Sequence, residues 1–119
     1  MSTDINDYIV NSAKLEWQPL VERGKHYEGV FVKSLRYDEA TKRSPSILLK
    51  FEPGASYPYH NHPGGEGLMV LKGSCLVNEA YLEAGDYLYT PKNFKHGVKS
   101  EKGCELMLNI PEEVEILEP

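Results

Sequence analysis

The stretch Gly54-Ala55-Ser56-Tyr57-Pro58-Tyr59-His60-Asn61-His62-Pro63-Gly64-Gly65-Glu66 decides how the rest of the chain is interpreted. His60 and His62 are two residues apart, and side chains at this spacing on a β-strand point to the same face. The Pro-Gly-Gly turn then brings the carboxylate of Glu66 in from the next strand. Two neutral imidazoles and one carboxylate that converge on one point predict a divalent-metal site.

A second stretch supplies a fourth candidate ligand, because the segment 85–96 ends in the histidine His96. The two stretches together resemble the two signature motifs of the cupin superfamily, the RmlC-like jelly rolls. The first motif, G-x5-H-x-H-x3,4-E-x6-G, is met in full, and the second, G-x5-P-x-G-x2-H-x3-N, is met in part. The matching residues are Gly54, His60, His62, Glu66 and Gly73 in the first motif, and Gly85, Pro91 and His96 in the second.

The second motif departs from the family pattern at two positions. Asn93 stands where the family has glycine, and Ser100 stands where it has asparagine. Asparagine adopts positive φ more readily than most residues, so we expect the exchange at Asn93 to be mild. The exchange at Ser100 leaves the four predicted metal ligands unchanged.

A narrower resemblance is to the ChrR-like cupins, named for the C-terminal domain of a zinc-containing bacterial anti-sigma factor. It extends from about Trp17 to Ile110 and implies an all-β cupin double-stranded β-helix, a jelly-roll barrel with the metal near its centre. The residues that carry it are Trp17 and Pro19, the run from His60 to Glu66, Val70-Leu71-Lys72-Gly73, and Gly103-Cys104-Glu105-Leu106.

The spacing of β-forming runs and turn residues independently predicts an all-β sandwich or barrel of nine or ten short strands. We expect an N-terminal segment, residues 1–16, with one short helix at about 5–11, followed by a single domain, residues 17–119. Lys72-Gly73 is interpreted as a hairpin turn between two of the strands. The predicted strands are 30–37, 46–51, 57–62, 67–71, 74–78, 81–82, 87–90, 95–100 and 104–110.

Strict alternation along these strands predicts which side chains face the metal. If His60 and His62 point inward, then Tyr57 and Tyr59 point outward. The inward side chains on the other strands make a mostly apolar box, which suits a small, partly hydrophobic ligand. The residues predicted to line it are Leu68, Val70, Tyr87, Tyr89, Phe94, Val98 and Leu106.

Three imidazoles and one carboxylate leave coordination positions open, which is typical of a catalytic metal site. This ligand set accepts Zn²⁺, Fe²⁺, Mn²⁺, Ni²⁺ and Cu²⁺, and the residues do not choose among them. The ChrR-like resemblance favours zinc, whereas cupins that activate dioxygen favour iron, nickel or copper. The first hypothesis is therefore a small-molecule metalloenzyme, a dioxygenase or a related lyase or isomerase, in which Glu66 also acts as a catalytic base.

The alternative hypothesis is a non-catalytic sensor or regulatory module related to the cupin domain of ChrR-type anti-sigma factors. In such proteins the cupin acts on a separate helical domain that holds the sigma factor. Residues 1–16 are too short for that domain and lack its His/Cys cluster, so we do not expect a sigma factor as partner.

Charge and composition exclude some partners and set the expected location. The net charge is −5 over 119 residues, whereas a nucleic-acid-binding face is basic. No apolar run approaches the roughly 18 residues of a membrane span, and the N-terminus has no signal-peptide pattern. We expect a cytoplasmic protein in which Cys75 and Cys104 are reduced core residues.

The outward side chains of Met69 and Leu71 need a cover on the face opposite Glu66. Either the N-terminal segment or a second copy of the chain can supply it. A homodimer is the favoured interpretation, because it is also common in the cupin family.

Overall fold

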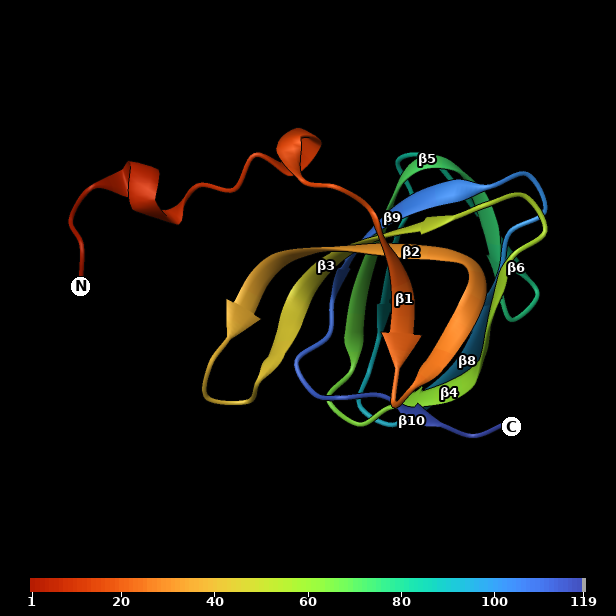
Figure 1. Ribbon diagram of the computed structural model, residues 1–119. Helices are drawn as coiled ribbons and strands as arrows, with labels where there is room; N and C mark the ends of the chain where they lie inside the picture. Colours follow the sequence, from red (N-terminus) through yellow and green to blue (C-terminus); the bar gives the residue numbers. More distant parts are fainter. Residues whose placement is uncertain (119) are drawn as a thin grey trace.

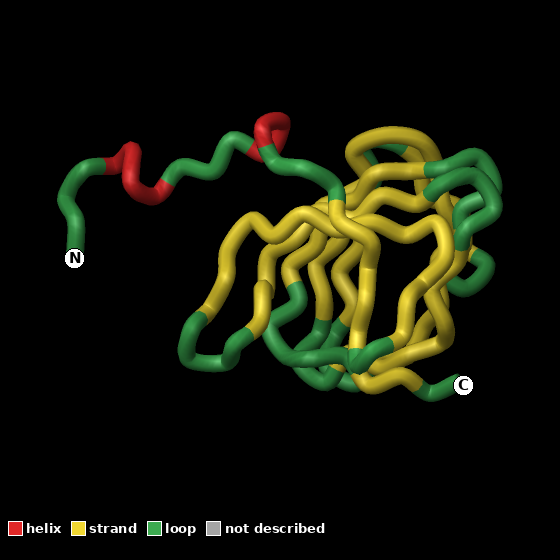
Figure 2. Tube along the Cα trace, viewed as in Figure 1, coloured by secondary structure: helices red, strands yellow, loops and turns green. Residues whose placement is uncertain are grey.

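The computed structural model describes residues 1–118, which form ten strands and two short 3-10 helices (Figure 1). The strands curl around one apolar core, and the prediction of an all-β cupin barrel is confirmed (Figure 2). The helices are η1 (Ile5–Tyr8) and η2 (Ser12–Lys14), and the strands are β1 (Gln18–Glu22), β2 (Lys25–Asp38), β3 (Arg43–Phe51), β4 (Ser56–His62), β5 (Glu66–Val77), β6 (Ala80–Glu83), β7 (Tyr87–Thr90), β8 (Phe94–Lys99), β9 (Cys104–Asn109) and β10 (Glu115–Ile116).

Antiparallel pairing connects the strands in the order β1-β2-β3-β9-β5-β8-β4-β10, and β6 and β7 also pair with β5. Inward side chains of β3, β5 and β9 fill the core, where Phe51, Leu68, Val70 and Leu106 are each at most 2% exposed. Alternation of apolar and polar residues along these strands explains why one face of the curled sheet is buried and the other is solvated.

One long strand replaces the two strands predicted on either side of Lys72-Gly73. β5 pairs with β7 and β9 along its first half and with β6 and β8 along its second half. The predicted hairpin turn is wrong because the chain bends at Gly73 without reversing. Gly73 has φ +72°, and a Cβ there would lie 2.1 Å from the carbonyl oxygen of Gly103, so only glycine fits the bend.

Two edge strands, β1 and β10, were not predicted. Pro19 interrupts the strand signal of β1, and β10 has only two residues. Glu115 and Ile116 in β10 pair with Asn61 and His60 in β4. The C-terminal segment thus pairs with the edge of β4, the strand that carries two of the predicted metal ligands.

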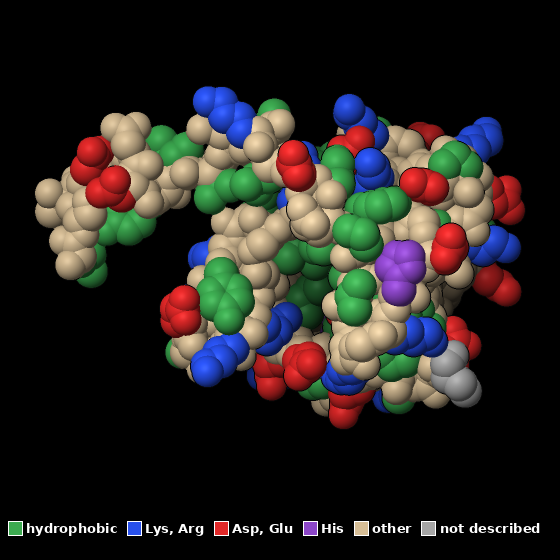
Figure 3. Space-filling model, in the orientation of Figure 1, with side chains coloured by type: hydrophobic (Ala, Val, Ile, Leu, Met, Phe, Trp, Pro, Cys, Tyr) green, Lys and Arg blue, Asp and Glu red, His purple; other side chains and the backbone are tan. Residues whose placement is uncertain are grey.

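The N-terminal segment leaves the barrel and extends into solvent (Figures 1, 2 and 3). The predicted helix at 5–11 is shorter than expected, since η1 ends at Tyr8. The first strand starts at Gln18, and the limits 17–119 of the domain stay a prediction, with Pro119 outside the described residues. Within residues 1–118, no helix has the length and apolar character needed to cross a bilayer.

Candidate metal centre

Neighbouring strands bring the four predicted ligands to one point inside the barrel. His60 and His62 project from β4, His96 lies directly opposite His60 on β8, and Glu66 begins β5. The turn before Glu66 is held by Gly65, whose N–H donates to the His62 carbonyl at 3.1 Å and whose φ is +80°. All four side chains are buried.

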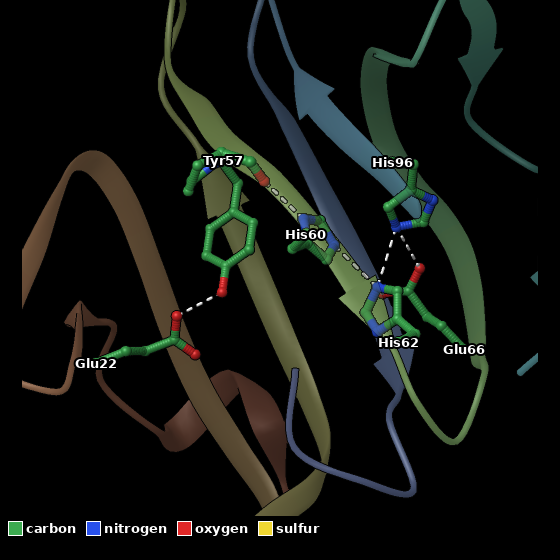
Figure 4. A network of polar contacts seen from close by, with 7 residues as sticks. Glu22, Tyr57, His60, His62, Glu66 and His96 are labelled. Carbon is green, nitrogen blue, oxygen red and sulfur yellow. Dashed lines mark hydrogen bonds and ion pairs between the residues drawn. The ribbon is translucent and has the colours of Figure 1, made fainter. Parts of the chain in front are cut away.

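The Nε2 atoms of the three histidines face one another (Figure 4). Nε2 of His62 lies 2.9 Å from Nε2 of His60 and 3.0 Å from Nε2 of His96. The carboxylate of Glu66 stands beside them, with Oε2 3.2 Å from Nε2 of His62 and Oε1 3.3 Å from Nε2 of His96. The three histidines therefore form a candidate metal site, flanked by one carboxylate.

The backbone determines which nitrogen of His60 faces the centre. Nδ1 of His60 lies 2.6 Å from the carbonyl oxygen of Pro58, which can only accept a hydrogen bond. In the neutral ring, Nδ1 therefore carries the proton and Nε2 presents its lone pair to the centre. This is the tautomer that a metal ligand requires.

Burial keeps His60 and His62 neutral by lowering the pKa of each. It lowers the pKa of His60 to about 4, and the Pro58 carbonyl only partly opposes this shift. Burial, together with the nearby rings of His60 and His96, lowers the pKa of His62 to about 3. Uncharged imidazoles at neutral pH are the form that binds divalent cations.

The donor set also fits a cation better than a hydrogen-bond network. Oε1 of Glu66, which lies 3.3 Å from Nε2 of His96, is buried without a hydrogen-bond partner in the described structure. If His62 and His96 carry their proton on Nδ1, as His60 does, the three Nε2 atoms present only lone pairs to one another and none can donate. A divalent cation between them would accept all of these lone pairs at once.

Tyr57 is also part of this interior, contrary to the prediction that it points outward. In the β4–β8 ladder, Tyr57 pairs with Val98 and His60 pairs with His96, so three steps on β4 match two steps on β8. This β-bulge adds one residue to β4 and reverses the alternation before His60. Tyr59 is 41% exposed, as strict alternation predicts, whereas Tyr57 is buried.

The cavity in front of the histidines has mostly apolar walls and a volume of about 50 Å³. Leu68, Val98 and Leu106 line it, as their positions suggested, and Val70 is buried in the core without lining it. Further residues that were not predicted to line the cavity come from β1, β3, β4 and the C-terminal segment. These include Leu20, Glu22, Ile47, Tyr57 and Val114.

The three aromatic residues predicted to line the cavity lie elsewhere. Tyr87 and Tyr89 are 64% and 63% exposed on the outer face of β7. Their cross-strand partners on β5 are Met69 and Gly67, not Glu66 and Leu68, and this register explains the error. Phe94 is 44% exposed, with its ring centroid 6.2 Å from that of His96.

Glu22 and Tyr57 form a second polar group in the cavity. The Tyr57 hydroxyl donates to Oε1 of Glu22 at 2.5 Å (Figure 4). Burial raises the pKa of the Tyr57 hydroxyl above its ordinary value, and the hydrogen bond to Glu22 raises it further. Tyr57 therefore stays protonated.

The two departures from the second cupin motif have separate structural roles. Asn93 has φ +66°, as expected for a position where the family has glycine, and its N–H donates to the His62 carbonyl at 2.8 Å. Ser100 is fully buried, and its hydroxyl donates to the Ser74 carbonyl at 2.7 Å. Ser100 thus links the residue after β8 to β5, and its hydroxyl makes no hydrogen bond to the histidines.

Comparison with known families and proteins agrees with this geometry. A family model described as the ChrR cupin-like domain matches residues 6–112. The DNA damage-repair/toleration protein DRT102 of Arabidopsis thaliana is 35% identical over 69 aligned positions, and the match covers 53% of this chain. The match spans 22% of the plant protein's length.

Two solved structures illustrate the shared fold. The polyketide cyclase RemF from Streptomyces resistomycificus superposes with a TM-score of 0.71 at 18% identity, over 93% of this chain and 85% of its own. An acetylacetone dioxygenase from Acinetobacter johnsonii superposes with a TM-score of 0.71 at 16% identity, over 86% of this chain and 72% of its own. At these identities the likeness concerns the fold.

Proposed function

Because the chain belongs to the family of ChrR cupin-like domains, we propose that it is a metal-dependent cupin that acts on a small molecule as a dioxygenase or a related lyase or isomerase. The observation that carries this proposal is the convergence of three Nε2 atoms, 2.9 and 3.0 Å apart, beside a buried carboxylate at the base of an apolar cavity. Closed structural metal sites have no such cavity in front of them.

His60, His62, Glu66 and His96 would hold one divalent cation, which would polarise an oxygen of the substrate as a Lewis acid and, if redox-active, exchange electrons with it. The chain's own residues do the rest. The Pro58 carbonyl orients His60, and apolar walls such as Leu68 and Leu106 exclude water from the site. Glu66 is a base within reach of a substrate proton at the centre, because its carboxylate borders both His62 and His96.

A β-diketone is the first substrate class to test. Such a compound offers two oxygens to a metal and an apolar body to the walls. The shared fold with an acetylacetone dioxygenase supports this choice, although a polyketide cyclase shares the fold equally well.

The test begins with metal analysis of protein purified without chelator. We expect about one divalent metal per chain, lost in His62→Ala and His96→Ala and kept in the matched control His26→Ala, since His26 is exposed on β2. Protein loaded with Fe²⁺, Ni²⁺ or Cu²⁺ is then mixed with acetylacetone, and oxygen consumption is recorded. Retention of the metal by His62→Ala and His96→Ala would overturn the ligand assignment.

The second candidate is a non-catalytic metal-dependent sensor, which the ChrR-like family assignment favours. A sensor holds zinc or another metal and binds a ligand without converting it. Stoichiometric zinc, with binding but no turnover of any diketone in protein loaded with each redox metal, would support this candidate over the enzyme.

We also propose that the chain forms a homodimer. The N-terminal segment supports this, because Ile5, Tyr8 and Ile9 are 54% to 71% exposed and η1 has no buried residue. A second copy would cover them, together with Leu71 on the outer face of β5. Light scattering of the full chain and of a variant without residues 1–11 tests this. We expect a dimer for the first and a monomer for the second, and a monomeric full chain would contradict the proposal.

A further inference from the structure

The cavity has polar groups at two places. One is the histidine cluster with Glu66, and the other is the hydrogen-bonded pair Glu22–Tyr57, which comes from β1 and the bulge of β4 (Figure 4). The remaining side chains that line the cavity are leucine, isoleucine, valine and phenylalanine. An apolar cavity that contains a carboxylate and a phenol has a second point at which a ligand can be recognised.

Packing holds the Tyr57 ring in one orientation. Its ring centroid lies 4.9 Å from that of Tyr27 on one side and 4.8 Å from that of His60 on another, with the His60 ring nearly perpendicular. The bulge at Tyr57 prevents the side chain from turning to the outer face. The hydroxyl is thus directed at Glu22 by the backbone and by two neighbouring rings.

Glu22 lines the cavity and keeps hydrogen-bonding capacity beyond its contact with Tyr57. The neighbouring cation, Arg23, turns away and binds the carboxylate of Glu113 at 3.2 Å and the carbonyl of Val114 at 3.1 Å. Among the described residues 1–118, the Glu22 carboxylate has one hydrogen-bond partner, the hydroxyl of Tyr57. Its Oε2 atom and the lone pairs of the Tyr57 oxygen therefore remain available as acceptors.

The donor count determines the ligand chemistry. The single hydroxyl proton of Tyr57 is given to Glu22, so both groups present acceptors and a ligand that meets them must donate. We propose that Glu22 and Tyr57 recognise a small ligand with an O–H or N–H group at one end, an apolar middle and metal-binding oxygens at the other end. The metal-binding end rests on the proposed function, whereas the donor end rests on this pair alone.

The test compares two compounds that differ only at the donor end. Benzoylacetone and para-hydroxybenzoylacetone are titrated by calorimetry into zinc-loaded protein, in which the diketone binds without an oxidation-reduction step. We expect the wild-type chain to bind the hydroxylated compound at least fivefold more tightly. The double variant Glu22→Leu/Tyr57→Phe should bind the two compounds within twofold of each other and keep its zinc.

The double substitution keeps the fold because it replaces both partners of a hydrogen bond by apolar groups of similar size. Glu113→Leu is the matched control, since Glu113 is an exposed glutamate near the same end of the barrel and should keep the fivefold preference. A wild-type chain without any preference, or a double variant that keeps it, would overturn the inference.

A second probe separates this inference from the proposed function. Phenol alone is titrated into metal-free protein and followed by ligand-observed NMR. Binding to the wild-type chain that weakens at least fivefold in the double variant supports the donor site even if neither zinc nor a diketone binds. Phenol binding that is absent, or equal in the two proteins, counts against the site whatever the metal result.

Discussion

Tyr57 and His60 are three residues apart on β4, yet both side chains face the same cavity, with ring centroids 4.8 Å apart. The bulge between them makes this arrangement, because it inserts one residue where strict alternation would send Tyr57 outward. It places a phenol beside the first histidine of the candidate metal centre. A single irregularity in one strand thus adds a polar group to an otherwise apolar wall.

Removing the charge of Glu66 should weaken metal binding without changing the shape of the site. In Glu66→Gln an amide replaces the carboxylate that lies 3.2 Å from Nε2 of His62. We expect divalent-metal affinity to fall at least tenfold, about 1.4 kcal/mol, because an anionic ligand becomes neutral. Competition with a coloured chelator measures it. Glu105→Gln is the control, since Glu105 only pairs with Lys72 at the surface, and an equal loss in both variants would contradict the assignment.

The metal-free protein should lose stability as the pH falls from 7 to 5. Burial lowers the pKa of His60 to about 4 and that of His62 to about 3, from an ordinary value of 6.5. Between these values the unfolded chain binds more protons than the folded chain, so the free energy of unfolding rises with pH and falls on acidification. The loss at pH 5 is on the order of 2 kcal/mol per histidine.

Urea denaturation at pH 7 and pH 5, with chelator present, measures this dependence. His62→Ala should lose less stability between the two pH values than the wild-type chain, whereas the exposed His26→Ala should lose as much. A wild-type chain that is equally stable at both pH values would show that the histidines are not held neutral by burial.

The bend of β5 should tolerate only glycine at Gly73. A Cβ at this position would lie 2.1 Å from the Gly103 carbonyl oxygen, in addition to the strain of φ +72°. We expect Gly73→Ala to lower the free energy of unfolding by more than about 3 kcal/mol. Gly85→Ala separates the two effects, because Gly85 also has positive φ but open space around it, and its cost should stay near 1 kcal/mol. Equal costs would rule out the steric account.

Asn93 should be replaceable by the glycine that the cupin motif has at this position. Its φ of +66° suits glycine, and its side chain accepts one long hydrogen bond of 3.3 Å from Asn61. We expect Asn93→Gly to change the free energy of unfolding by less than about 0.5 kcal/mol and Asn93→Ala to cost about 1 kcal/mol. Thermal unfolding of the three proteins gives the order, and an alanine variant as stable as the glycine variant would refute the backbone explanation.

Local patterns in the sequence determined the fold class and the ligand cluster. His60 and His62 share a face because of the two-residue period of a strand, and the Pro-Gly-Gly turn carries Glu66 to the next strand. Gly54, Gly73 and Gly85 occupy glycine positions of the two cupin motifs, and these positions do not depend on which strands pair. His60, His62 and Glu66 are close together in the chain, so their spacing was enough to predict that they converge, whereas His96 and the cupin barrel followed from the resemblance to the two cupin motifs.

The tertiary structure decided what surrounds the cluster. The bulge that turns Tyr57 inward, the bend that makes β5 one strand, and the pairing that turns Tyr87 outward all depend on which strands lie side by side. Glu22 reaches the cavity from a strand 35 residues away from Tyr57 in sequence. The register between distant strands is set by the packing of the whole barrel. It therefore cannot be predicted from residue spacing along a single strand.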